Sequence, residues 1–438
     1  TNIAIPKDVS FIGAGAFGAC ARLTAIEVAA SNAAYGSLDG VLFNKDRTAL
    51  IQCPAGKTGS FLVAGTATAI GELAFAECAG LTRIEIPNGV RRIELRAFVG
   101  CAGLTNAAIP GSVTQIVGRA HVGCGRLLDI EVSETNSAYR SIAGVLFDKS
   151  GRTLLEYPGG RTGTCEVAAG AADIGEAAFA YNSNLTRVVI AASVTNIGDS
   201  AFDGCVSLTN AVLGAGVRHI GDCAFSFCLQ LSDVDFGSGL RSIGQGAFAA
   251  CERLKGPVIP DGVTDLGYWA FSGCAALTNL TIPDSVIHIG AYAFQDCGFA
   301  QVAIGAGLDH MESALFQGCA GLARITIPAT VAAMDGYVFE GCSELTAVYF
   351  LGGPPAAEDT DVFSDSTPTV YYLLGTPQWE ATFGGRPTAP WLPEVRAEGL
   401  GAHDDHFGLT LAWAAGKTVV VEACADLEHP AWMPVATN

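Results

Sequence analysis

The chain has 438 residues, of which 50% are hydrophobic, and its formal net charge is −19. This excess of carboxylates argues against nucleic acid as a partner, because such binding needs clustered lysine and arginine side chains. No apolar run approaches the roughly 18 to 20 residues that cross a bilayer, so we predict no membrane span.

The chain opens inside a repeat. Thr1–Pro6 matches Thr105–Pro110 and Thr278–Pro283, so we expect that an upstream segment with a signal peptide has been removed. The full unit, clearest at residues 261–283, recurs about every 23 residues. Its phenylalanine stands at Phe17, Phe75, Phe98, Phe179, Phe202, Phe225, Phe248, Phe271, Phe294, Phe316 and Phe339. A fixed period in this range indicates a solenoid, whose core forms only when units stack.

Each unit contains three predicted pieces. Leu-Thr-x-Val-x-Ile alternates apolar and polar residues, as a half-buried strand does, and proline ends it. Val-x-x-Ile-Gly is a second short extended piece. Ala-Phe-x-x-Cys is predicted to be a tight helical or 3₁₀ turn with Phe and Cys pointing inward. We therefore predict a β-rich solenoid of about 13 coils around one continuous core, with the Leu-Thr strands in one long parallel sheet.

Two insertions of 35 residues, at about 31–65 and 135–169, interrupt the period. They match each other residue by residue: Gly40–Lys45 corresponds to Gly144–Lys149. The pattern Val-Leu-Phe, a polar turn and a second apolar run is typical of a β-hairpin. We predict that each insertion is a hairpin excursion with a structural role. One further irregularity is His121 at a phenylalanine position, where we expect a looser coil.

Of the 15 cysteines, most follow the repeated phenylalanine by three residues, at Cys20, Cys78, Cys101, Cys205, Cys228, Cys251, Cys274, Cys297, Cys319 and Cys342. We interpret them as small apolar side chains stacked inside the solenoid. Disulfide bonds between neighbouring coils are an alternative, since stacked strands lie roughly 5 Å apart. However, Asn182 fills the same position without breaking the pattern. No Cys-x-x-Cys or Cys/His zinc spacing occurs, so no metal or cofactor is predicted.

The repeats fade after Phe350, and the solenoid is predicted to end at about residue 374. Residues 375–396 are expected to form a capping segment and linker, in which three aromatic side chains cover the end of the core, namely Trp379, Phe383 and Trp391. Residues 397–438 are predicted to be a partial β-domain with strands near Phe407–Trp413, Lys417–Ala423 and Trp432–Val435.

The units at 282–297 (Ile-Pro-Asp-Ser-Val-Ile-His-Ile-Gly-Ala-Tyr-Ala-Phe-Gln-Asp-Cys) and 320–328 (Ala-Gly-Leu-Ala-Arg-Ile-Thr-Ile-Pro), together with the Gly-Val-Leu-Phe-x-Lys hairpins, resemble BspA-type bacterial leucine-rich repeats. The resemblance covers about residues 1–374. It implies a leucine-rich-repeat right-handed superhelix in a secreted or cell-surface protein. Such proteins are often adhesins that bind extracellular-matrix proteins, host proteins or other cells. The resemblance brings no catalytic motif and names no ligand.

The exposed positions of the Leu-Thr strands are the predicted binding face. One column of this face contains Arg83, Asn106, Arg187, Asn210, Asp233, Asn279 and Arg324, and a second contains Glu85 and Asp235. Neither column shows the aromatic and arginine anchors that dominate many interfaces, so a merely solvated sheet face stays an alternative.

Weaker candidates for metal binding are also present. His219, His288 and His310 share one column, and the last two belong to adjacent coils, where they could share a metal ion. Because this column is exposed and variable, chance explains the three histidines better than a metal site does. The segment His403–His406 lies in a predicted linker, where no surrounding structure would hold its side chains in place. The acidic segment Glu358–Asp361 lacks the spacing of a calcium-binding loop.

These observations predict a non-catalytic extracellular module that binds a protein or another cell surface. The signatures Gly-x-Ser-x-Gly, His-Glu-x-x-His and Gly-x-x-x-x-Gly-Lys do not occur, which argues against an enzyme. The alternative is a structural subunit of a cell-surface assembly or filament that self-associates through solenoid ends or sheet edges. A passive spacer that carries another domain is a third hypothesis.

Overall fold

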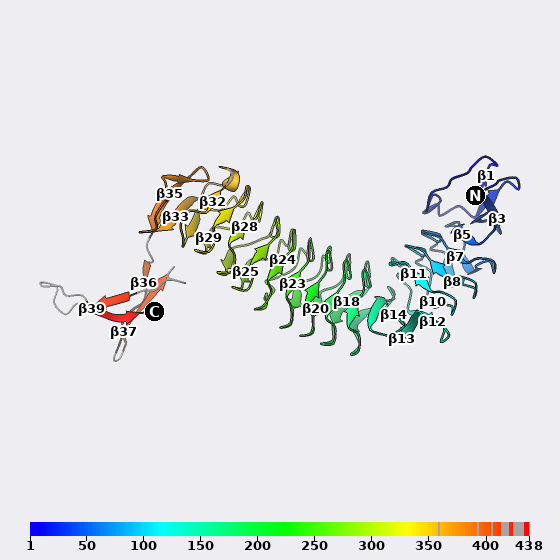
Figure 1. Cartoon of the computed structure of the whole chain (residues 1–438), viewed down its shortest axis with the longest axis horizontal. Helices are drawn as coiled ribbons and strands as arrows, with labels where there is room; N and C mark the ends of the chain where they lie inside the picture. Colours follow the sequence, from blue (N-terminus) through cyan, green and yellow to red (C-terminus); the bar gives the residue numbers. More distant parts are fainter. Residues whose placement is uncertain (358–359, 392–393, 404–405, 413–419, 424–432, 438) are drawn as a thin grey trace.

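The computed structural model describes residues 1–357, 360–391, 394–403, 406–412, 420–423 and 433–437. Short strands stack coil upon coil into a long arch, with β1 (Asn2–Ile5) near one end and β33 (Thr369–Leu373) near the other (Figure 1). Among the described residues, the single helix is the 3₁₀ helix η1 (Thr360–Phe363). The β-rich solenoid predicted from the repeat is thus confirmed.

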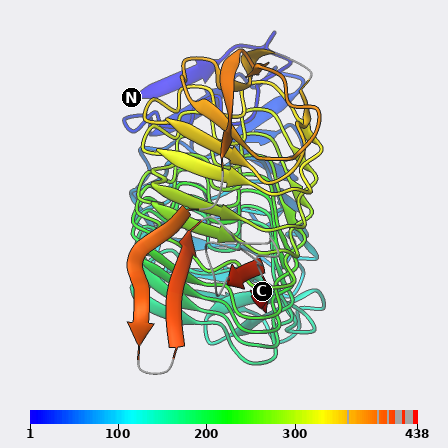
Figure 2. The ribbon, with the colours of Figure 1, turned by 90° about the vertical axis from the view of Figure 1, so that its left-hand side faces the viewer.

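The Leu-Thr segments form the first strand of each coil. Beyond β1 and β33 they are β2 (Ala25–Val28), β6 (Gly59–Leu62), β8 (Leu81–Glu85), β10 (Asn106–Ile109), β12 (Asp129–Val132), β16 (Gly163–Glu166), β18 (Leu185–Val189), β20 (Asn210–Val212), β22 (Asp233–Asp235), β25 (Asn279–Ile282), β27 (Gln301–Ile304), β29 (Arg324–Ile327) and β31 (Ala347–Phe350). They run parallel and nearly in register, one coil behind the next (Figure 2). Side chains alternate inward and outward along each strand, which is why this pattern places every second residue in the core.

These first strands do not form the one long sheet that we predicted. They divide into the separate sheets β1-β2, β6-β8, β10-β12, β16-β18-β20-β22, β25-β27 and β29-β31-β33-β35-β34. The break between β22 and β25 falls on Lys255–Ile259, which forms no strand. Pro257 stands there in the middle of the strand position, and proline supplies no amide hydrogen for a ladder.

The Val-x-x-Ile segments form a second strand of two residues in each coil. These are β7 (Ala69–Ile70), β9 (Arg92–Ile93), β11 (Gln115–Ile116), β17 (Asp173–Ile174), β19 (Asn196–Ile197), β21 (His219–Ile220), β23 (Ser242–Ile243), β24 (Asp265–Leu266), β26 (His288–Ile289), β28 (His310–Met311), β30 (Ala333–Met334) and β32 (Ala356–Ala357). Their pairing continues unbroken from β17 to β26, past the break in the first strands. The second strands therefore hold the coils together where the first strands separate.

The Ala-Phe-x-x-Cys segment is a chain of tight turns with hydrogen bonds between residues three apart, as in the 3₁₀ alternative that we predicted, but the turns do not join into a helix. The amide of Cys228 donates to the Phe225 carbonyl at 3.3 Å, while the amide of Phe225 donates to Ala247 in the next coil at 2.7 Å. Cys223 and Phe227 have φ values of 53° and 55°, in the left-handed region that a helix excludes. This side of each coil thus forms a further ladder between successive coils.

The repeated aromatic rings lie one above another inside the array, as predicted. From Tyr157 to Phe363 neighbouring rings stack with centroids between 4.6 and 5.8 Å apart. Beside them the cysteine thiols do more than fill space. The Cys251 thiol donates to the Phe225 carbonyl at 3.2 Å, and the hydroxyl of Ser366 donates to the equivalent Phe339 carbonyl at 2.7 Å. The first coil is the exception, because Phe17 is only half-buried and Cys20 is exposed.

Each insertion holds three antiparallel strands. They are β3 (Tyr35–Leu38), β4 (Val41–Asn44) and β5 (Ala49–Gln52) in the first, and β13 (Tyr139–Ile142), β14 (Val145–Asp148) and β15 (Thr153–Glu156) in the second. The last strand of each set pairs in parallel with the next second strand, β7 or β17.

The insertions divide the interior, which is not the one continuous core that we predicted. Buried side chains form three clusters, and the boundaries fall within the insertions: Leu42 and Val41 belong to different clusters, as do Leu146 and Val145. Adjacent residues of a strand point to opposite sides of the sheet. One insertion strand therefore contributes to the core on each side of it.

A buried asparagine anchors each insertion to the coil before it. The Asn136 side-chain amide donates to the carbonyls of Pro110 and Val113 at 2.9 Å, and its oxygen accepts from the amides of Ala138 and Tyr139 at 2.8 Å. Asn32 makes the corresponding bonds in the first insertion. All the bonding groups of this amide are thus satisfied inside the protein.

Replacing Asn136 by alanine is expected to lower the free energy of unfolding by about 2–3 kcal/mol, because four backbone groups lose their partner at once. Urea unfolding followed by circular dichroism measures this change. Asn106→Ala is the matched control, since Asn106 is exposed on a neighbouring coil, and its effect should stay within about 0.5 kcal/mol. Equal effects of the two substitutions would contradict the anchoring role.

The coil at His121 is not looser than its neighbours, which corrects our expectation. The imidazole is buried and stacks on Phe98, with ring centroids 4.8 Å apart and planes inclined by 8°. Glu156 from the second insertion meets it: the His121 amide donates to Oε1 at 2.7 Å, and His121 Nδ1 lies 3.0 Å from Oε2. The histidine thus continues the aromatic stack and binds the insertion to it.

Aromatic side chains cover the end of the large cluster. Trp379 lies 5.1 Å from Phe350 between ring centroids, and Phe383 lies 5.4 Å from the same ring. Phe383 belongs to β34 (Thr382–Phe383), which pairs with β35 (Arg386–Trp391). Two antiparallel pairs follow: β36 (Glu394–His403) with β37 (His406–Ala412), and β38 (Val420–Ala423) with β39 (Met433–Thr437). Residues 413, 417–419 and 432 of the predicted strands lie outside the described residues.

Candidate protein-binding face

The predicted binding residues lie on the outer side of the first strands. Asn210 is half-buried, and the others are exposed: Arg83, Glu85, Asn106, Arg187, Asp233, Asp235, Asn279 and Arg324. Parallel register brings members of one column to neighbouring positions on successive coils, since Arg187 pairs with Asn210 and Asn210 with Asp233. We call this surface the strand face.

Three of the predicted residues are joined into a polar ladder. Arg187 Nε donates to Asn210 Oδ1 at 3.1 Å, and Asn210 Nδ2 donates to Asp233 Oδ2 at 2.6 Å. The ladder spans three coils and places a cation at one end and a carboxylate at the other. Holding these long side chains in place lowers the entropy that a partner must remove on binding.

The remaining predicted residues are not part of this ladder. Arg83 pairs with Glu85 on β8, with Nε and Oε1 3.1 Å apart, on the other side of the second insertion. Asn279 lies two coils beyond Asp233, and its side-chain amide donates to Thr278 Oγ1 at 3.3 Å. The structure therefore divides the predicted column into several local groups.

A groove of about 1080 Å³ opens on the strand face beside Asn279. Its walls come from Lys255–Ile259, from β25 with the turn that follows it, and from the end of β27. This groove was not predicted, although Pro257 in the column of Val234 and Leu280 was a signal for it in the sequence.

Aromatic side chains gather on the strand face near β31 and β33, where we predicted no such anchors. The rings of Tyr349 and Tyr371 stack with centroids 5.0 Å apart, and Trp391 meets Tyr349 edge-on at 5.1 Å. Tyrosine and tryptophan are the side chains that most often dominate binding energy. The register Tyr349↔Tyr371 brings them together, and the irregular repeats beyond Phe350 obscured that register in the sequence.

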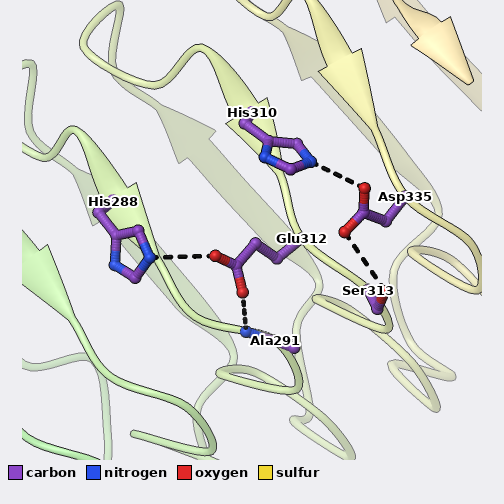
Figure 3. A network of polar contacts seen from close by, with 6 residues as sticks. All are labelled: His288, Ala291, His310, Glu312, Ser313 and Asp335. Atoms are coloured by element: carbon purple, nitrogen blue, oxygen red, sulfur yellow. Dashed lines mark hydrogen bonds and ion pairs between the residues drawn. The ribbon is translucent and has the colours of Figure 1, made fainter.

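The histidine column does not converge on a shared metal position. His288 Nε2 lies 3.0 Å from Glu312 Oε1, and His310 Nε2 lies 2.8 Å from Asp335 Oδ1, so each histidine faces a carboxylate from the next coil (Figure 3). His219 contacts Ser242 Oγ at 2.9 Å. Throughout the described ranges, no three His, Cys, Asp or Glu side chains are grouped to hold a metal ion.

The two acidic segments extend beyond the described residues. Asp404 and Asp405 of the segment His403–His406 lie outside them, as do Glu358 and Asp359 of the other segment. In the part of the chain with described coordinates, no helix has the length and apolarity to cross a membrane.

Most of the buried cysteines have the electrostatics of a packed interior. Burial raises the pKa of Cys205 and of Cys274 to about 12, so both remain thiols at neutral pH. Thiolates are the reactive and metal-binding form of cysteine. All 14 cysteines in the described residues are free, and all of them except Cys20 and Cys223 are buried.

The array matches a known family along most of its length. The family model described as "BspA type Leucine rich repeat region (6 copies)" matches residues 1–39, 57–155, 164–277 and 270–353. No protein among the curated ones matches.

Two solved structures are similar to this chain to different degrees. A leucine-rich repeat protein from Eubacterium ventriosum ATCC 27560 is 21% identical with a TM-score of 0.53, over 73% of this chain and 83% of that one. A leucine rich cell surface protein from Faecalibacterium prausnitzii A2-165 is 22% identical with a TM-score of 0.41, over 81% of this chain and 79% of that one. The first of these likenesses supports the solenoid fold. Since the family model covers more than half of the residues, the chain belongs to the BspA-type leucine-rich repeat family.

Proposed function

We propose that this chain is a non-catalytic, extracellular protein-binding module that attaches a bacterial surface or secreted protein to another protein or cell. The observation that carries the proposal is the strand face, where the ladder Arg187–Asn210–Asp233, the groove and the half-buried rings of Tyr349 and Tyr371 follow one another along one surface. An extended partner could contact several of these groups at once.

The family and the chemistry of the surface support this interpretation. Solenoid repeats offer extended surfaces that proteins use for recognition, and membership in the BspA-type family favours a secreted or cell-surface location. The polar groups of the strand face are held by neighbouring coils, and none is enclosed in the kind of site that chemistry on a small substrate needs. Binding is therefore the function that this geometry supports best.

The triple variant R187A/N210A/D233A is expected to weaken binding of the purified chain to its partner by about tenfold, because both charged ends and the amide between them are lost. The partner is sought among immobilised fibronectin, laminin and collagen and on intact epithelial cells. Affinity is measured by biolayer interferometry for the matrix proteins and by flow cytometry for the cells.

The matched control is R218A/N196A/D265A, which removes the same three residue types at or next to the second strands, on another side of the coils. This control should bind within twofold of the unchanged chain. Equal losses in both triples would show that the strand face is not the binding surface. Concentration-dependent oligomers in light scattering, abolished by neither triple, would favour the structural-subunit alternative.

A further inference from the structure

The first strands lose their backbone pairing at the groove. In the regular coils the amide of the residue that follows the first strand reaches the next coil, as Leu213 donates to the Asp235 carbonyl at 2.8 Å. At the same place in the following coils, the amides of Phe236 and Ile259 have no backbone acceptor among the described residues. Lys255 still donates to the Ser232 carbonyl at 3.2 Å, so the strands separate only beyond this point.

Pro257 accounts for the separation. It stands at the position of Val234 and Leu280, and its buried ring fills the same place in the core. Because N–H groups alternate sides along a strand, the missing amide hydrogen at Pro257 is one that would point toward β25. β25 consequently pairs with β27 alone among the described strands. Gly256 still lies against the Asn279 carbonyl, so the other edge of β25 is open at the N–H and C=O groups of Thr281.

The groove and the strand next to it are acidic. The charged residues that line the groove are Asp261, Asp284 and Lys255, and the exposed Asp233 and Asp235 lie on β22, one coil away. Arg241 approaches the next turn at Gly262. The side chain of Val258, 82% exposed, adds an apolar contact at the same place. Unpaired strand groups favour an extended polypeptide, and the excess of carboxylates favours basic side chains on it.

We propose that this groove binds an extended, lysine- or arginine-rich segment of a partner protein, which adds as a strand to the free edge of β25. The proposal rests on the protein-binding function above and specifies the partner's chemistry. Backbone hydrogen bonds to Thr281 hold the segment, and the surrounding aspartates attract its basic side chains. Pro257 keeps the site open, because it prevents the protein's own chain from closing the ladder.

The test uses an acetylated, amidated and fluorescein-labelled peptide, (Lys-Thr)₄, and the whole chain, with fluorescence anisotropy as the readout. Pro257→Val restores the missing amide, so the protein's own strand should close the ladder. Binding of the peptide is then expected to weaken at least tenfold, while amide exchange at Thr281 becomes slower. Pro260→Val is the matched control, because Pro260 does not line the groove, and it should change affinity less than twofold.

Two further comparisons separate strand addition from simple charge attraction. The peptide (Lys-Pro)₄ has the same charge but lacks half of the backbone donors, so it should bind at least tenfold more weakly than (Lys-Thr)₄. The variant D261N/D284N leaves the backbone unchanged and should weaken binding at least threefold at low salt. Equal binding of both peptides, or unchanged binding by a folded Pro257→Val chain, would overturn the proposal.

The outcomes also separate this inference from the proposed function. If the chain binds matrix proteins or cells through the ladder but does not bind (Lys-Thr)₄, the groove proposal fails and the binding function stands. If Pro257→Val abolishes oligomers that the unchanged chain forms in light scattering, the edge pairs with a second copy, and the proposal of a basic partner is wrong.

Discussion

Phe225→Ala is expected to lower the free energy of unfolding by about 3–5 kcal/mol, because it removes a whole ring from the interior of the array. The ring is fully buried and stacks on Phe202 at 4.8 Å and on Phe248 at 5.1 Å between centroids. Its removal leaves a cavity that the flanking coils cannot fill, because hydrogen bonds on three sides fix their spacing. Urea unfolding followed by tryptophan fluorescence measures the loss.

The coil supplies its own control for this experiment. Phe227, two residues away, is 57% exposed, so Phe227→Ala should change stability by less than about 0.5 kcal/mol. All five tryptophans follow the second insertion in the sequence, and Trp379 packs against the large core cluster. Equal effects of the two substitutions would mean that the stacked rings do not stabilise the array.

His121→Phe is expected to lower the free energy of unfolding by about 3–5 kcal/mol, because it leaves the Glu156 carboxylate without its buried partner. The double variant H121F/E156Q should recover most of this loss. It reproduces the first insertion, where Phe17 and Gln52 stand at the corresponding positions. A double-mutant cycle measured by urea unfolding gives the coupling between the two side chains. Simple additivity would show that they do not act as a pair.

The same pair gives the protein a dependence on pH. Burial disfavours the charged imidazolium, but the Glu156 carboxylate outweighs burial and raises the pKa of His121 above its usual 6.5. Since the folded-state pKa is the higher one, the stabilisation is complete below about pH 6.5 and is lost as the pH rises through the folded-state value. The unchanged chain should therefore lose stability relative to H121F/E156Q above neutral pH, as urea unfolding at a series of pH values would measure.

The family resemblance and the repeat together predicted the solenoid because its core depends on local periodicity. A phenylalanine and a cysteine at fixed spacing specify stacked coils, whatever happens elsewhere in the chain. The exposed columns of the strand face could be predicted for the same reason, since alternation along a strand decides which side chains point outward. The family's role in adhesion stays a proposal, because no sequence pattern names a partner.

The sequence by itself thus determined the coil, its inward rings and its outward columns. The tertiary structure alone decided what the interruptions of the array do: the strands of the insertions divide the core between two sides, and the sheet opens into a groove at Pro257. It also decided that Glu156 meets His121, a contact between residues that belong to different coils. These features depend on contacts between one coil and the next, and the repeat pattern of a single coil does not specify those contacts.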